Sequence, residues 1–121
     1  MRKLTVIPGK RDPELVHASR MIQKLVRQGA IIRLEHRALV NCSKYSLRLT
    51  QLVTMLSRFR VDRFEILDQE GTRINVGYGT ILEELEDQQI VREFALKVVV
   101  EASETPGRVA VIDIGQLDER R

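Results

Sequence analysis

The stretch Gly29-Ala30-Ile31-Ile32-Arg33-Leu34-Glu35-His36-Arg37, followed by residues 44–59, decides the fold of this chain. In the first segment apolar and charged side chains alternate, which predicts a strand with one core face and one charged face. In the second segment apolar residues recur at steps of three and four, which predicts a helix with a wide apolar stripe. The connecting segment, residues 37–44, is basic at both ends and is predicted to be a loop.

A second helix is predicted before this unit. Asp12 is a good N-cap, Pro13 suits the first helical position, and Gly29 supplies the left-handed residue that ends a helix. The sequence therefore predicts a helix from Pro13 to about Gln28, preceded by a short strand at residues 4–7.

The remainder of the chain reads mainly as strands. A hairpin is predicted over residues 61–78, and further strands over 94–102 and 108–114. Thr80 and Glu83 match the capping-box pattern, which predicts a short acidic helix from Ile81 to about Gln88. The element order predicts an α/β two-layer sandwich with two helices packed on one face of a mixed sheet. We expect a single domain over residues 1–121, with an acidic insertion near residues 79–92.

Composition bounds the class of protein. The 121 residues are 43% hydrophobic and 31% charged, which is ordinary for a globular domain with its own core. No apolar run approaches the roughly 20 residues that span a bilayer, so we expect no membrane segment and a cytoplasmic location. A single cysteine, Cys42, excludes an internal disulfide framework.

Charge is distributed unevenly along the chain. Residues 1–63 carry 14 Lys or Arg against 4 Asp or Glu, and residues 64–121 carry 6 against 13. The two parts therefore have formal charges of +10 and −7. Such asymmetry indicates a face that attracts polyanions, although a solvated charge distribution without a ligand gives the same pattern.

Two basic motifs carry the polyanion hypothesis. Lys10 and Arg11 precede the first predicted helix, whose free amides and dipole favour an anion. Along that helix, His17, Arg20, Lys24 and Arg27 recur at helical spacing without acidic partners at i+4. The alternative interpretation is a solvated turn and a solvated helix face. Further positive charge in the central unit comes from Arg33, Arg37, Lys44 and Arg48.

Catalytic and metal chemistry find little support. His17, His36 and Cys42 show no known ligand spacing and no order typical of nucleophilic catalysis. His36 is expected to be a partly buried strand residue and Cys42 a small apolar residue. The acidic cluster of residues 83–87 is best explained as a solvated helix face. We expect no enzyme, no metal site and no cofactor.

The pattern resembles the Alba family of small nucleic-acid-binding proteins over residues 4–67. Gly9-Lys10-Arg11-Asp12-Pro13 is similar to the family's glycine, two basic residues and proline, with Asp12 added. Arg27-Gln28-Gly29 resembles the end of its first helix, and residues 37–44 lie at its basic loop. The resemblance implies a strand, helix, strand, helix order that ends in a long hairpin, a dimer, and binding to DNA or RNA. Related sporulation regulators share this fold with less basic surfaces.

These observations favour a non-enzymatic protein that binds DNA or RNA through phosphate contacts and forms a homodimer through the stripe of residues 45–59. The alternative is a regulatory or assembly module that binds a protein partner through its acidic C-terminal half. Few aromatic residues are present, which disfavours sequence-specific reading of single strands. The candidate nucleic-acid-binding residues are Lys10, Arg11, Arg20, Lys24, Arg33, Arg37 and Lys44.

Overall fold

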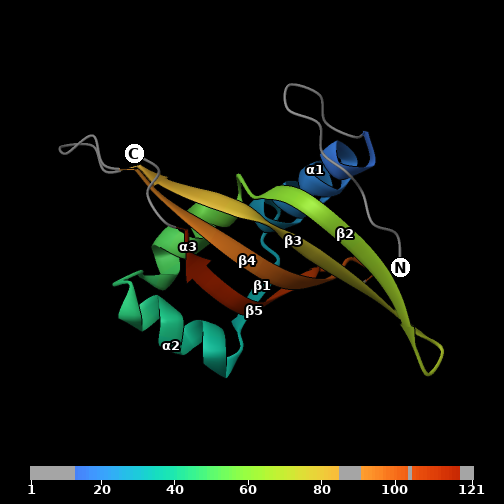
Figure 1. Ribbon diagram of the computed structural model, residues 1–121. Coiled ribbons are helices and arrows are strands. Elements are labelled where there is room, and N and C mark those ends of the chain that lie inside the picture. Colours follow the sequence, from blue (N-terminus) through green and yellow to red (C-terminus); the bar gives the residue numbers. More distant parts are fainter. Residues whose placement is uncertain (1–12, 85–90, 104, 118–121) are drawn as a thin grey trace.

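The computed structural model describes residues 13–84, 91–103 and 105–117, with three helices and five strands in these ranges. The predicted strand at residues 4–7 lies outside the described residues. The protein is a mixed α/β structure (Figure 1). In chain order its elements are α1 (Pro13–Arg27), β1 (Ile31–Leu34), α2 (His36–Lys44), α3 (Leu49–Leu56), β2 (Arg60–Gln69), β3 (Thr72–Glu84), β4 (Val91–Glu101) and β5 (Arg108–Gln116).

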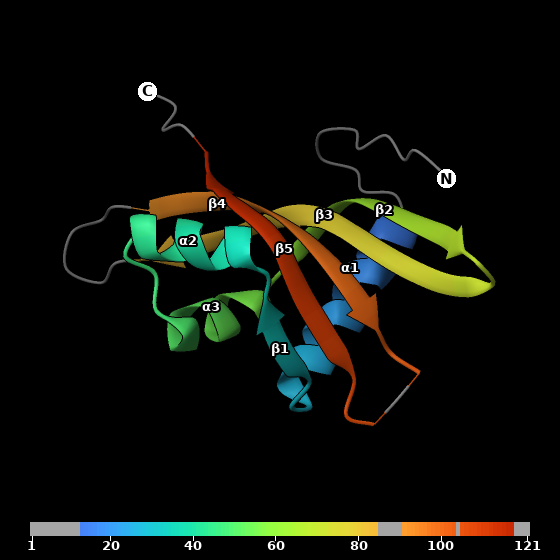
Figure 2. The same ribbon diagram turned by 90° about the horizontal axis from the view of Figure 1, so that it is seen from below.

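The five strands form one mixed sheet in the order β1-β5-β4-β3-β2. The last four strands pair antiparallel, whereas β1 pairs parallel with β5, Ile32 lying opposite Val109. The last strand of the chain is therefore placed between the first strand and β4 (Figure 2). This arrangement confirms the prediction of a mixed sheet.

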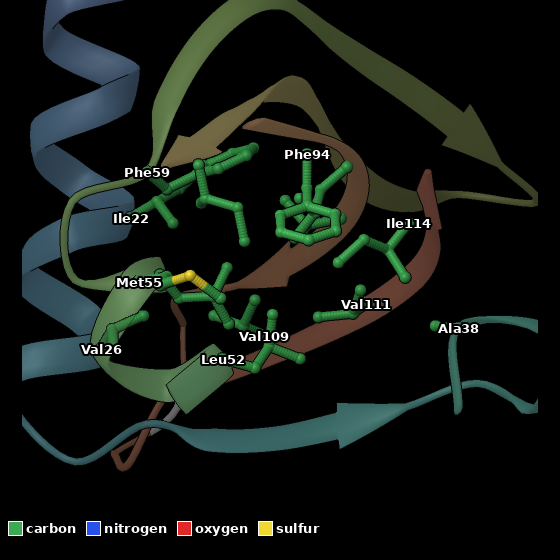
Figure 3. Packing of buried hydrophobic residues seen from close by; sticks show 14 of the residues in the cluster. Ile22, Val26, Ala38, Leu52, Met55, Phe59, Phe94, Val109, Val111 and Ile114 are labelled. Carbon is green, nitrogen blue, oxygen red and sulfur yellow. The ribbon is translucent and has the colours of Figure 1, made fainter. Parts of the chain in front are cut away.

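The core lies between one face of this sheet and helices α1 and α3. Alternate residues of β4, Phe94, Leu96, Val98 and Val100, are buried on that face. Ile22 of α1 and Met55 of α3 pack toward the same cluster, together with Phe59 (Figure 3). The opposite face of the sheet is covered by none of the helices in the described ranges.

Helix α1 confirms the prediction from its end signals. It begins at Pro13 and ends at Arg27, and Gly29 adopts a positive φ of 87°. Its buried side is formed by Leu15, Ala18, Ser19, Ile22 and Val26. The amphipathic pattern therefore located both the helix and its core face.

The central unit differs from the prediction. The strand is limited to Ile31–Leu34, and residues 37–44 are not a loop but belong to α2. His36 is thus an exposed residue at the start of a helix rather than a partly buried strand residue. The predicted helix of residues 44–59 is shortened to α3, because Ser46 takes a positive φ of 56° and separates the two helices.

Helix α2 lies along the edge of β5 beyond the end of β1 (Figure 2). The Glu35 amide donates to the Val111 carbonyl, and the Asn41 side-chain amide donates to the Ile114 carbonyl at 2.9 Å. Ala38 and Cys42 face the core from this position. Beyond the end of β1, donors at the start of α2 and within it thus bind carbonyl groups on the edge of β5. These carbonyls have partners although β1 is only four residues long.

The β2–β3 hairpin is confirmed, and the acidic helix is wrong. Glu70 and Gly71 form the turn with positive φ values, and the hairpin extends beyond the rest of the sheet (Figure 1). Residues 81–84 continue strand β3, where Ile81 pairs with Phe94 and is buried. Burial in the sheet outweighs the local capping-box signal. Residues 85–90 of the predicted insertion lie outside the described residues.

One glycine permits a close approach between β2 and β3. A Cβ atom at Gly79 would lie 2.1 Å from the backbone oxygen of Arg60, which is far inside contact distance. This approach occurs where the register shifts between Val61 and Arg63.

Among the helices that the structure describes, none is long and apolar enough to cross a membrane.

Candidate nucleic-acid interface

Helix α1 carries a row of cations on the side away from the core. Arg20, Lys24 and Arg27 are all exposed and follow one another at helical spacing. The single carboxylate of this helix is Glu14 in its first turn. The row is therefore a positively charged strip over about two helical turns.

Two hydrogen bonds bring the connection between α3 and β2 beside this strip. The Gln23 side-chain amide donates to the Phe59 carbonyl at 2.8 Å, and the Val61 amide donates to the Ser19 hydroxyl at 2.8 Å. Arg58 and Arg60 flank Phe59 and are exposed. Because Gln23 lies one position before Lys24 and within one turn of Arg20 and Arg27, the hydrogen bond brings the backbone next to Arg58 and Arg60 close to the row of cations on α1. We call Arg20, Lys24, Arg27, Arg58 and Arg60 the basic cluster.

The basic cluster differs from four other arginines in the described part of the chain. None of its members forms an ion pair with a described carboxylate. Elsewhere pairing occurs: Arg33 pairs with Glu35, Arg37 with Asp113, Arg63 with Glu65 and Arg92 with Glu83. Like charges at one site repel each other, so an anionic ligand at the cluster is electrostatically favoured.

The structure divides the predicted site residues into separate groups. Arg20 and Lys24 belong to the basic cluster. Arg33 lies on β1 and pairs with Glu35 at 2.7 Å. Arg37 is 3.8 Å from Asp113, and Lys44 Nζ lies 5.8 Å from the ring centre of Tyr45. These three residues lie on β1 and α2, at the sheet edge opposite to β2. Lys10 and Arg11 lie outside the described residues.

The sheet face opposite to the helices carries an aromatic and charged group at its centre. The guanidinium of Arg63 lies 4.0 Å from the ring centre of Tyr78, and Lys97 Nζ lies 5.6 Å from it. Arg63 also pairs with Glu65 at 2.8 Å, although Arg63 Nε and Glu65 Oε1 are buried without a hydrogen-bond partner among the described residues. The pair is therefore held by charge attraction rather than by an aligned hydrogen bond.

Several carboxylates of the C-terminal half are engaged inside the protein. Glu83 is almost fully buried and binds Arg92 through both oxygens, at 2.7 and 2.9 Å. Arg92 also donates to the Tyr45 carbonyl. Asp113 accepts from Asn41 and from the Ile114 amide. The prediction of a solvated acidic helix face is thus wrong for Glu83, which holds the end of β3 to β4.

The residues considered for catalysis lie apart. His17 is exposed on α1, His36 is exposed on α2, and Cys42 lies on the buried side of α2. Burial raises the pKa of the Cys42 thiol above its ordinary range, which keeps it protonated. Within residues 13–84, 91–103 and 105–117, no group of three or more His, Cys, Asp or Glu side chains is arranged to hold a metal ion.

Sequence reasoning missed Arg58 and Arg60 as partners of α1. They flank the last aromatic residue of the predicted helix stripe, which is a weak signal for a turn. The approach of this segment to α1 depends on the Gln23–Phe59 hydrogen bond, whose partners are 36 residues apart. Arg27 belongs to the predicted basic stripe of the first helix, although it is not among the candidate contacts.

Comparisons with protein-family models, with curated proteins and with solved structures found no match.

Proposed function

We propose that this protein is a non-enzymatic nucleic-acid-binding protein that contacts phosphate groups of DNA or RNA through the basic cluster. The observation that carries the proposal is the row of three exposed cations on α1, which the Gln23–Phe59 hydrogen bond joins to the segment that bears Arg58 and Arg60; none of the five is paired with a described carboxylate. Three of these cations lie on one rigid helix, whose core side is fully packed against the sheet. A fixed row of cations suits a polymer with regularly spaced phosphates.

Arginine and lysine outside the cluster complete the proposed contact set. Lys10 and Arg11 precede α1 in the sequence, and we include both among the proposed phosphate contacts. Arg33, Arg37 and Lys44 form a second, smaller group on β1 and α2. We assign the main affinity to the basic cluster, because Arg33 and Arg37 are engaged by carboxylates.

An Alba-like relationship, a homodimer and a cytoplasmic location are parts of the same proposal. The exposed apolar residues Leu39 and Val40 on α2, with Leu49 on α3, support self-association. These residues lie near the predicted stripe of residues 45–59, of which Leu52, Met55 and Leu56 are buried in the core of one copy. Docking of a protein partner to the acidic half receives less support, since Glu65, Glu83 and Asp113 are already paired.

A charge-reversal experiment tests the proposal. We expect the protein to bind a fluorescent DNA duplex and a structured RNA at low salt, with affinity that falls as salt is added. Lys24→Glu combined with Arg27→Glu should reduce the affinity at least tenfold. The matched control is Arg48→Glu combined with Arg73→Glu, which makes the same charge change at exposed positions outside the cluster.

The two double variants distinguish an effect of the basic cluster on affinity from an effect of the protein's net charge. Equal losses in both would show that overall charge governs binding, and the cluster would lose its assigned role. Absence of binding to either nucleic acid at low salt would remove the proposal. Circular dichroism should be the same for both variants, because the four positions are exposed.

A further inference from the structure

A shallow groove crosses the sheet face that the helices leave uncovered. Its volume is about 600 Å³. Thr80, Ala95 and Gly115 stand in register on β3, β4 and β5, and these small residues form its floor. The next row in register, Tyr78, Lys97 and Asp113, forms one wall. The groove is thus flat, with an aromatic ring beside it.

The Tyr78 ring is flanked by one cation from each neighbouring strand. Arg63 of β2 stacks on the ring at 4.0 Å, and it does not line the groove. Lys97 of β4 lines the groove and approaches the ring less closely, at 5.6 Å. The pair of Arg63 with the buried Glu65 fixes the stacked guanidinium. A flat group that stacks on the groove side of Tyr78 takes the place of the loosely held Lys97 ammonium, which then lies beside that group.

Charges around the groove select against a phosphate inside it. Asp62 and Asp113 line the groove and repel an anion. Asp113 is already held by Asn41 and Arg37, and the carboxylate keeps further acceptor capacity for an N–H donor. A neutral flat ring is not repelled by these carboxylates, and its N–H groups can donate to Asp113. Unpaired nucleobases have these properties.

The groove is continuous with the basic cluster through one residue. Arg60 of the cluster stands opposite Thr80 of the groove floor in the β2–β3 register. Since β2 is the edge strand, a nucleic-acid strand that leaves α1 passes Arg60 before it reaches the open face. Lys97 then offers a cation beside the groove for the backbone of that strand.

From these contacts we infer that the groove beside Tyr78 binds one unpaired nucleobase of a single-stranded segment. The base stacks on Tyr78 over the floor of Thr80, Ala95 and Gly115, while Arg60 and Lys97 attract the adjoining phosphates. This inference rests on the proposed function and names the form of nucleic acid that the site prefers. A single aromatic ring supplies the stacking contact, so the low aromatic content of the chain does not exclude it.

Tyrosine fluorescence offers a direct test, because the chain has no tryptophan and only two tyrosines. Tyr45 packs against Phe94 with ring centres 5.5 Å apart, on the helix side of the sheet. We expect unlabelled oligothymidylate to quench the fluorescence of the full chain and of Tyr45→Phe. In Tyr78→Phe the quenching should be lost, while the affinity for the oligonucleotide should stay within about twofold, because Phe also stacks.

Affinity measurements complete the test. Tyr78→Leu should lower the affinity for oligothymidylate about tenfold and leave duplex affinity unchanged. Two results would overturn the base site but leave the proposed function standing. One is unchanged affinity of Tyr78→Leu for both duplex and oligothymidylate, and the other is fluorescence quenching that persists in Tyr78→Phe. A wild-type chain that binds neither probe would overturn the proposed function as well. If Tyr78→Leu fails to fold, the comparison of the two Tyr→Phe variants decides.

Discussion

Gln23 on α1 donates a side-chain hydrogen bond to the backbone carbonyl of Phe59, 36 residues further along the chain. Phe59 is fully buried, and its carbonyl lies between two arginines of the basic cluster. This contact therefore joins core packing to the placement of the proposed phosphate contacts. It gives Gln23 a role in binding although the residue carries no charge.

Gln23→Leu should weaken both folding and nucleic-acid binding. The substitution leaves the Phe59 carbonyl without its donor, at a cost of about 1–3 kcal/mol in the free energy of unfolding. Urea denaturation measures that cost, and a fluorescence titration measures the fall in affinity. Gln28→Leu is the control, because Gln28 is exposed just after α1. An affinity loss no larger than that of the control would show that Gln23 does not position the cluster.

Arg92 should be among the most sensitive positions for stability. It binds both oxygens of the buried Glu83 and also the Tyr45 carbonyl. Arg92→Leu leaves a buried carboxylate without its partner, which should cost roughly 3–5 kcal/mol. The double variant Glu83→Leu with Arg92→Leu should recover part of this loss. Guanidinium denaturation measures the free energy of unfolding of both variants. A double variant less stable than Arg92→Leu would contradict the prediction.

Gly79→Ala should disturb the pairing of β2 with β3. The new Cβ atom would meet backbone rather than a movable side chain, so the strands must separate. We expect a loss of about 1–3 kcal/mol, as for an overpacked core. Gly115→Ala is the matched control, because no atom lies within 4 Å of the position that its new Cβ would take. Thermal unfolding followed by circular dichroism should separate the two variants clearly.

Single members of the basic cluster should change the salt dependence of binding in equal steps. Arg58→Ala removes one proposed phosphate contact, so the slope of log affinity against log salt should become shallower by about 0.9 for duplex DNA. Arg73→Ala, at an exposed position outside the cluster, should leave the slope unchanged. Titrations at four salt concentrations give both slopes. The same change in both variants would argue against a local contact.

Cys42 should make stability depend on pH in the alkaline range. Burial raises the pKa of its thiol in the folded protein, whereas the unfolded thiol titrates at about 8.5. Above that pH the unfolded state binds fewer protons than the folded state, so the free energy of unfolding falls as pH rises. Cys42→Ala should show a smaller fall between about pH 8 and pH 10. Parallel pH profiles for the two proteins would contradict this assignment.

Local sequence signals correctly predicted the elements that begin or end at a proline or a glycine. Pro13 and Gly29 bound α1, and the turn at Gly71 defines the β2–β3 hairpin, because backbone conformation at these positions is set by the residue itself. The loop predicted at α2 is wrong for a different reason. The place of this helix depends on the contact of Asn41 with Ile114, 73 residues away, which periodicity cannot reveal.

The candidate site was only partly predictable for the same reason. The row of Arg20, Lys24 and Arg27 follows from helical spacing alone. The pairing of Arg37 with Asp113 joins distant segments and could not be anticipated. Tyr78 and Lys97 became neighbours only through the register of β3 and β4, so the groove could not be found from the order of residues.

The position of β5 has a consequence for the order in which the chain can fold during its synthesis. Among the described strands, β1 pairs with β5 alone, and the Asn41 side chain of α2 donates to the Ile114 carbonyl. About 74 residues separate the end of β1 from the start of β5, so the first strand waits for nearly the whole chain before it finds its neighbour. Until β5 has been synthesised, the core residues Val109, Val111 and Ile114 are missing, so Ile32 and Leu34 should be more exposed in the nascent chain than in the folded protein.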